Sequence, residues 1–136
     1  MRPLGAQWPR LQRKAVSAKR AWLLLDLDGT LVPIADHLSQ VHLAEHARYL
    51  LKQLVGHPKV SVALISGRAL RDLKALIGVT GLYYAGNHGL ELQGPKLRYV
   101  HPVARKIRPL LKQIARSLKT ALQPIPGAWV EEKSLT

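Results

Sequence analysis

Three short apolar runs alternate with helical patterns along this sequence, and this alternation limits the folds it can adopt. The runs cover residues 22–25, 60–65 and 82–85, and their length and lack of charge are typical of strands buried in a parallel sheet. Between them, apolar residues recur at intervals of three and four over 43–55 and 70–77, which predicts two amphipathic helices. Strand–helix–strand units of this kind build an α/β fold.

Polar residues follow each of the three strands directly. The three clusters are Asp26 with Asp28, Ser66–Arg68 and Asn87–Glu91. The carboxyl ends of parallel strands lie at one edge of the sheet, and ligands of open α/β sheets bind there. The sequence therefore predicts that three clusters far apart in the chain form one site.

The two ends of the chain differ from this middle part. Residues 1–20 contain two prolines, six Lys and Arg residues and no acid, which favours a flexible basic extension. After Leu92 the pattern predicts a hairpin around Pro95 and then an amphipathic helix over 107–122 with a basic outer face. Another strand is expected at 128–130.

Composition excludes several classes of protein. The sequence has no cysteine, so disulfides and thiolate metal sites are excluded. It has no run of about 20 apolar residues, so no membrane-spanning helix is expected, and we expect a cytoplasmic protein. With 21 Lys and Arg against 8 Asp and Glu, the formal net charge is +13. Nucleic acid, a membrane surface or a phosphorylated small molecule would each suit that charge.

The first cluster has the composition of a phosphoryl-transfer site. Asp26 and Asp28 can act as a nucleophile and as a general acid and base, and Gly29 lets the backbone turn so that both carboxylates face one pocket. A magnesium ion would offset the repulsion between carboxylates and phosphate. Asp and Gly also occur together in turns that have no catalytic role, so a structural turn is the alternative interpretation.

The second cluster suits a phosphate group. Ser66, Gly67 and Arg68 combine a hydroxyl, accessible backbone amides and a guanidinium at the start of a predicted helix. Serine is also a routine first residue of helices, and the Asn87–Glu91 run could be only a tight turn.

A separate pattern, outside the three polar clusters, is suggestive of a zinc site. His42, Glu45 and His46 match the spacing of an inverted zinc-peptidase motif, but no acid suited to be the third ligand follows. A helix start with solvated histidines is the simpler interpretation.

Four motifs follow one another in an order that is typical of one family. They are Leu23–Val32, Ser66–Arg68, Gly86–Glu91 and Pro126–Lys133. In this order, over residues 21–136, the sequence resembles the trehalose-6-phosphate phosphatase family of the haloacid dehalogenase superfamily. The resemblance implies a haloacid-dehalogenase-like Rossmannoid parallel sheet, partial here, over 21–102, followed by the start of an α+β cap over 103–136.

The resemblance also implies an activity and residue roles. Trehalose 6-phosphate would be hydrolysed to trehalose and phosphate, with Mg²⁺ as cofactor and an aspartyl-phosphate intermediate. Asp26 would be the nucleophile and a metal ligand, and Asp28 the general acid and base and a second metal ligand. The implied binding residues are Ser66, Gly67 and Arg68 for the phosphate group, and Asn87, His88, Gly89, Glu131 and Lys133 for the rest of the substrate.

The given sequence lacks the last motifs of the family. Family members continue with a lysine motif and a Gly-Asp-Asp motif that completes the magnesium site, and this sequence has neither. We therefore expect an amino-terminal fragment with little or no turnover of its own and with unpaired sheet edges.

Two alternatives stay open. One is a phosphatase of the same superfamily for another sugar phosphate, and the other is a non-catalytic basic module that binds nucleic acid or anionic lipid. On the first interpretation no membrane or nucleic-acid partner is expected. The sequence does not indicate the oligomeric state.

Overall fold

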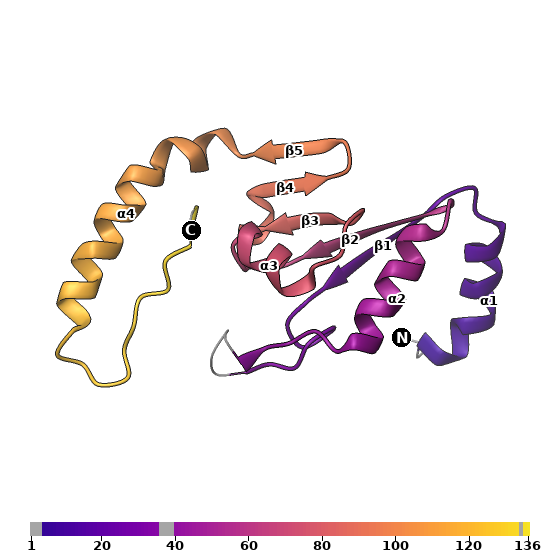
Figure 1. Cartoon of the computed structure of the whole chain (residues 1–136), viewed down its shortest axis with the longest axis horizontal. Coiled ribbons are helices and arrows are strands. Elements are labelled where there is room, and N and C mark those ends of the chain that lie inside the picture. Colours follow the sequence, from indigo (N-terminus) through magenta and orange to yellow (C-terminus); the bar gives the residue numbers. More distant parts are fainter. Residues whose placement is uncertain (1–3, 36–39, 134) are drawn as a thin grey trace.

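A single five-stranded sheet organises the chain (Figure 1). The computed structural model describes residues 4–35, 40–133 and 135–136. The strands, in their order in the sheet, are β1 (Ala21–Asp26), β2 (Val60–Ile65), β3 (Tyr83–Gly86), β4 (Glu91–Gly94) and β5 (Leu97–Val100). The first three run parallel, and β4 and β5 form an antiparallel hairpin at one edge. The predicted parallel core and the predicted hairpin are both confirmed.

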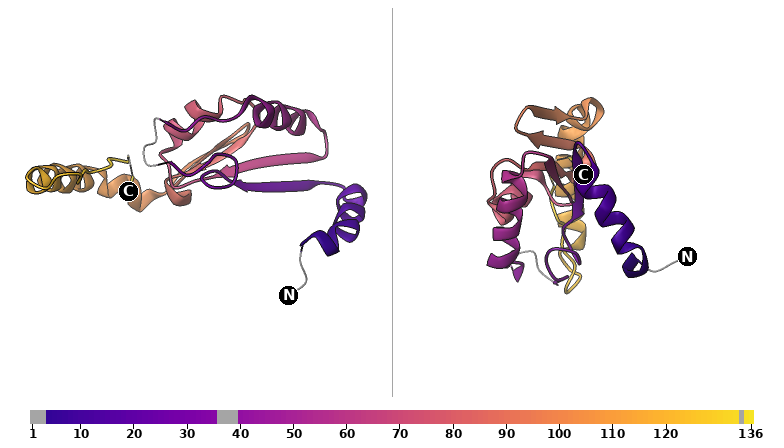
Figure 2. Two further views of the ribbon diagram at one scale, coloured as in Figure 1. Left: turned by 90° about the horizontal axis from the view of Figure 1, so that it is seen from below. Right: turned by 90° about the vertical axis from the view of Figure 1, so that its right-hand side faces the viewer.

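Two helices connect the parallel strands and cover one face of the sheet. They are α2 (Glu45–Gly56) and α3 (Leu70–Ile77), and both were predicted. Figure 2 shows them on the same side of the sheet. Their inward residues pack against the strands in one core. Gly78 ends α3 in the left-handed conformation, with φ of 62°, which a residue without a Cβ adopts at little cost.

The opposite face of the sheet has no helical layer in the part of the chain that the structure describes. Trp22 and Leu24 of β1 point to this face and are exposed, as is Ile65 of β2, which lies beside Asp26 in the register. Parallel sheets are usually covered on both faces. The described residues therefore form two layers, the sheet and one layer of helices, of a fold that ordinarily has three.

A long helix leads away from the hairpin. Helix α4 spans Pro102–Leu122, so it begins five residues before the predicted start at Ile107. Residues 123–133 then run back along α4 toward the sheet (Figure 1). An ion pair between Lys119 of α4 and Glu132 joins this segment to the helix. The predicted strand at 128–130 is wrong: these residues are extended but have no neighbouring strand among the described residues to hydrogen-bond with.

The basic amino-terminal segment is helical rather than irregular. Helix α1 spans Leu4–Ser17, with Pro9 inside it, and lies beside the start of β1. The prolines suggested a break in regular structure. However, Trp8, Leu11 and Ala15 recur at intervals of three and four residues, which is the spacing of one helix face.

Leu64 and Leu24 provide a matched test of which sheet face holds the fold together. Leu64 is fully buried, whereas Leu24 is 64% exposed on the bare face. We expect Leu64→Ala to lower the free energy of unfolding by about 2–5 kcal/mol and Leu24→Ala by less than about 1 kcal/mol. Urea denaturation of both variants measures this difference. Equal losses would contradict the one-sided core.

Candidate functional site

The loop after β1 positions the two predicted carboxylates. Leu27, between them, is fully buried in the core, so its neighbours Asp26 and Asp28 are both left exposed. The Thr30 hydroxyl donates to Asp26 Oδ2 at 3.2 Å and orients that carboxylate. Gly29 turns the backbone with φ of 83°, and its N–H donates to the Val32 carbonyl at 2.8 Å. The loop thus holds two carboxylates at the carboxyl end of β1.

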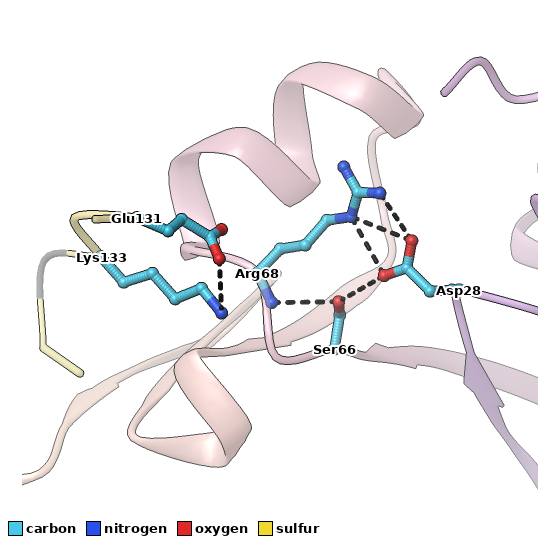
Figure 3. A network of polar contacts seen from close by, with 5 residues as sticks. All are labelled: Asp28, Ser66, Arg68, Glu131 and Lys133. Carbon is cyan, nitrogen blue, oxygen red and sulfur yellow. Dashed lines mark hydrogen bonds and ion pairs between the residues drawn. The ribbon is translucent and has the colours of Figure 1, made fainter. Parts of the chain in front are cut away.

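The second cluster contacts the first through an ion pair (Figure 3). Arg68 Nη2 donates to Asp28 Oδ1 at 2.6 Å, and Arg68 Nε donates to Asp28 Oδ2 at 3.0 Å, which makes the contact bidentate. The Ser66 hydroxyl donates to Asp28 Oδ2 at 3.5 Å and accepts from the Arg68 N–H at 3.1 Å. The Arg68 side chain is only 8% exposed, against 39% for Asp28. A buried cation is therefore paired with a half-exposed anion.

The third cluster joins the second through the backbone. The Asn87 N–H donates to the Arg68 carbonyl at 2.7 Å, and the His88 N–H donates to the Ser66 carbonyl at 3.2 Å. Asn87, His88 and Gly89 form a short turn in which Asn87 and His88 both have positive φ. The predicted convergence of the three strand ends is confirmed.

The turn after β3 also explains the glycine at position 67. A Cβ placed on Gly67 would lie 2.5 Å from Cε1 of the His88 ring, closer than real Cβ contacts allow. The imidazole therefore lies over the backbone of Gly67. The sequence suggested only that a glycine here exposes its amides to phosphate, and the structure adds the packing of His88 as a reason for it.

The last predicted pair reaches the same region from the end of the chain. Lys133 Nζ lies 3.4 Å from Glu131 Oε2, and Figure 3 shows both side chains near Arg68. A cavity of about 720 Å³ lies between α3, β4, α4 and this segment. Its polar lining includes Lys74, Glu91, Arg108, Lys112, Glu131 and Lys133. Ala69, the residue after Arg68, is part of the lining of this cavity. Asp26 and Asp28 are not part of it.

Of these lining residues, Lys74, Arg108 and Lys112 were outside the predicted clusters, and Glu91 was predicted only as the end of the Asn87–Glu91 cluster. Glu91 accepts a hydrogen bond from Asn87 Nδ2 at 2.7 Å, and Arg108 and Lys112 are four residues apart on α4. A signal for the α4 pair was present, because residues at that spacing share a helix face. The basic face of this helix had been read only as a solvent-exposed one.

The electrostatics of the site depend on Arg68. Its hydrogen bonds lower the pKa of Asp28 below the ordinary value of 3.8, although partial burial of the carboxyl acts in the opposite direction. The positive charge of Lys133 lowers that pKa further. Asp28 is therefore held as a carboxylate while Arg68 is paired with it.

The donor set suits a hard cation. Asp26 and Asp28 offer carboxylate oxygens, and Mg²⁺ commonly binds through one or two carboxylates, several waters and a substrate phosphate. The described residues contain no group of three or more His, Cys, Asp or Glu side chains that could hold a metal ion. For the zinc pattern, α2 begins at Glu45, so His42 lies outside the helix that carries His46.

Together, the fold and the site define an α/β protein with a carboxylate pair at one strand end and a loop beside it that carries a hydroxyl and a guanidinium. The sequence profile of the trehalose-phosphatase family matches residues 24–136, so the chain belongs to this family. Its fold is haloacid-dehalogenase-like, as the resemblance implied. No helix in the described residues is long and apolar enough to cross a membrane.

Individual relatives agree with the family assignment. The chain is 36% identical to trehalose-phosphate phosphatase of Mycobacterium leprae, over 87% of this chain and 27% of that protein. It is 28% identical to trehalose-phosphate phosphatase B of Arabidopsis thaliana, over 86% of this chain and 33% of that protein. The chain thus spans about a third or less of the curated relatives it matches.

The solved structures support the fold. The C-terminal domain of C. albicans trehalose-6-phosphate phosphatase superposes with a TM-score of 0.76 and 24% identity, over 92% of this chain and 43% of that one. A trehalose-6-phosphate phosphatase related protein gives a TM-score of 0.74 at 17% identity, over 84% and 48% of the two chains.

The ion pair of Arg68 and Asp28 predicts a specific dependence of stability on pH. Because the pKa of Asp28 is lowered in the folded state, its contribution is present above about pH 3.8 and is lost as pH falls through the folded pKa. Asp28→Asn removes this contribution. We expect the variant to be less stable than the parent at about pH 7, by at most about 1 kcal/mol after solvent screening, and the difference to shrink toward about pH 3. Urea denaturation at both pH values tests this, and parallel pH profiles would contradict it.

Gly67 allows a second test of the site geometry. We expect Gly67→Ala to displace the His88 ring, to shift its NMR signals and to lower the free energy of unfolding by about 1–3 kcal/mol. Gly5→Ala in α1 is the control, because nothing lies within 4 Å of a Cβ at that position. A Gly67→Ala spectrum with unchanged His88 signals would show that the ring does not lie over residue 67.

Proposed function

We propose that this chain carries the nucleophile and the phosphate-binding loops of a magnesium-dependent phosphatase that hydrolyses trehalose 6-phosphate to trehalose and phosphate. The observation that supports this most directly is the gathering of Asp28, Ser66, Arg68 and the Asn87–Gly89 turn at one edge of the sheet. Family membership supports the same reaction. The proposed location is the cytoplasm.

The chemistry follows from the two carboxylates. Asp26, oriented by Thr30, attacks phosphorus and forms an aspartyl phosphate while the sugar oxygen leaves and takes a proton from Asp28. In the second step a water molecule attacks phosphorus and gives its proton to Asp28, which releases phosphate and restores Asp26. Splitting hydrolysis into two displacements makes each of them easier.

Arg68 has a different role before and after substrate binding in this proposal. In the structure its guanidinium is paired with Asp28, which keeps that carboxyl ionised. A phosphate dianion offers Arg68 and Ser66 a second anionic partner. When Arg68 turns to the phosphate, Asp28 loses the hydrogen bonds that lower its pKa and can carry the proton that the leaving group needs.

Asp26 and Asp28 are the residues that would hold Mg²⁺. The ion, when bound, neutralises charge on the phosphate and on the attacking carboxylate. Asp28 would contribute its backbone carbonyl to the ion, which leaves its side chain able to exchange protons.

The cavity favours a sugar as the leaving group. Glu131 and Lys133, with Glu91 and Arg108, line it with the charged acceptors and donors that sugar hydroxyls bind. The names of the relatives identify trehalose phosphate as their substrate. A phosphatase for another sugar phosphate stays the second candidate, because the same cavity would fit other polar rings.

The proposed reaction predicts a clear effect of Asp26→Asn. Since the chain spans a third or less of its relatives, we place the substitution in a complete protein in which residues 24–136 are continued by the remainder of the M. leprae relative. We expect phosphate release from trehalose 6-phosphate to fall by about a thousandfold or more, because the amide cannot form the covalent intermediate. Substrate affinity should change far less.

The same assay distinguishes the two candidates. Trehalose 6-phosphate should be hydrolysed faster than glucose 6-phosphate by the parent protein, and chelation of Mg²⁺ should stop both reactions. Preference for the monosaccharide would favour the second candidate. Turnover that survives Asp26→Asn would contradict the covalent route.

A further inference from the structure

Helix α1 has two chemically distinct faces. Trp8, Leu11 and Ala15 lie on one face because they are three and four residues apart, while Arg10 and Arg13 lie with Lys14 on the opposite face. Trp8 is 58% exposed and Leu11 is 39% exposed. No side chain from Gly5 to Ser17 is buried. The apolar face is therefore available to a partner.

The charge around this helix has a single sign. Residues 1–20 contain no Asp or Glu, and Lys19 and Arg20 lie between the end of α1 and the first residue of β1. Lys59 adds another cation there, because its carbonyl accepts a hydrogen bond from the Ala21 N–H at 2.8 Å. None of these cations is in an ion pair with another residue over 4–35, 40–133 or 135–136. The region should attract an anionic surface.

The helix lies far from the candidate site. It precedes β1, whereas Asp26 and the loops that gather around Arg68 lie at the carboxyl end of the same sheet (Figure 1). Figure 2 shows α1 beyond the end of the sheet, away from α3 and α4. A partner bound to α1 would leave the site open.

We propose that α1 binds the surface of an anionic phospholipid membrane. The helix lies in the plane of the interface, with Trp8 and Leu11 inserted among the lipid chains and with Arg10, Arg13 and Lys14 near the headgroups. A basic amphipathic helix with Trp and Leu on its apolar face and low overall hydrophobicity has the chemistry of such anchors. Each cation near an anionic surface adds to the attraction.

The apolar face is the reason to choose a membrane over nucleic acid. Binding to the phosphates of a nucleic acid uses cations and gives an exposed Trp and Leu stripe nothing to bury against. For a phosphatase the sequence predicts no membrane partner, and it leaves anionic lipid open only for a non-catalytic basic module. The helix changes this expectation, since only a regular helix separates the apolar residues from the basic ones.

Helix α4 is a competing surface and must be distinguished. It too is basic on one side, and Leu118 on its apolar side is 45% exposed, close to the value for Leu11. However, Leu118 lines the cavity of the candidate site together with Arg108. Leu118→Ser is therefore a matched control for Leu11→Ser, with the same side chain, the same kind of element and similar exposure.

Co-sedimentation of the full chain with lipid vesicles tests the proposal. We expect binding to vesicles of phosphatidylcholine mixed with phosphatidylglycerol, weak binding to phosphatidylcholine alone, and a blue shift of tryptophan fluorescence on binding. Leu11→Ser should weaken binding about tenfold, because it removes one of the two large apolar side chains that insert. The double variant Arg13→Gln/Lys14→Gln should bind the anionic vesicles more weakly, and its binding should depend less on salt. The control variant Leu118→Ser should bind like the parent.

Leu11 is exposed, so Leu11→Ser should fold like the parent, and circular dichroism of each variant verifies this. Equal binding by Leu11→Ser and the parent would overturn the proposal, as would equal binding to the two kinds of vesicle. Loss of binding in Leu118→Ser but not in Leu11→Ser would assign the surface to α4 and would overturn it as well.

Discussion

The bidentate contact of Arg68 with Asp28 is the interaction on which the site depends. It joins the loop after β1 to the loop after β2, and the Arg68 carbonyl accepts from Asn87 of the loop after β3. One residue therefore contacts all three strand ends through its side chain and its backbone. The guanidinium side chain is only 8% exposed, and in the structure Asp28 supplies the hydrogen-bond acceptors that it needs. A substrate phosphate is the natural alternative partner.

The sequence predicted the core well because the core is set by local patterns. Buried parallel strands are continuous apolar runs, and α2 and α3 have clear helical spacing, so both could be read without the structure. The convergence of three polar loops followed from topology alone. The contact between Arg68 and Asp28 did not, because two side chains that both suit a ligand give no sign in the sequence that they pair with each other.

The errors lie where long-range context decides the structure. Residues 128–130 have strand composition, yet a strand needs a partner, and none is present among the described residues. Helix α1 was missed because Pro9 outweighed a weak apolar spacing. The roles of Glu91, Arg108 and Lys112 as cavity residues depend on how α4 and the end of the chain pack, which the sequence does not show. The bare face of the sheet, and the lack among the described residues of a third carboxylate beside Asp26 and Asp28, fit a chain that spans about a third of the curated relatives it matches.

The central claim is that three loops enclose one phosphate group together with a cation. Mapping of amide chemical shifts on the full chain, with inorganic phosphate and Mg²⁺ added, tests it most directly. The account predicts that the largest shifts fall together at Asp28, at Ser66–Arg68 and at Asn87–Gly89, and that both additions are needed for the full effect. Shifts confined to the basic residues of α1 and α4, with those three loops unchanged, would contradict it.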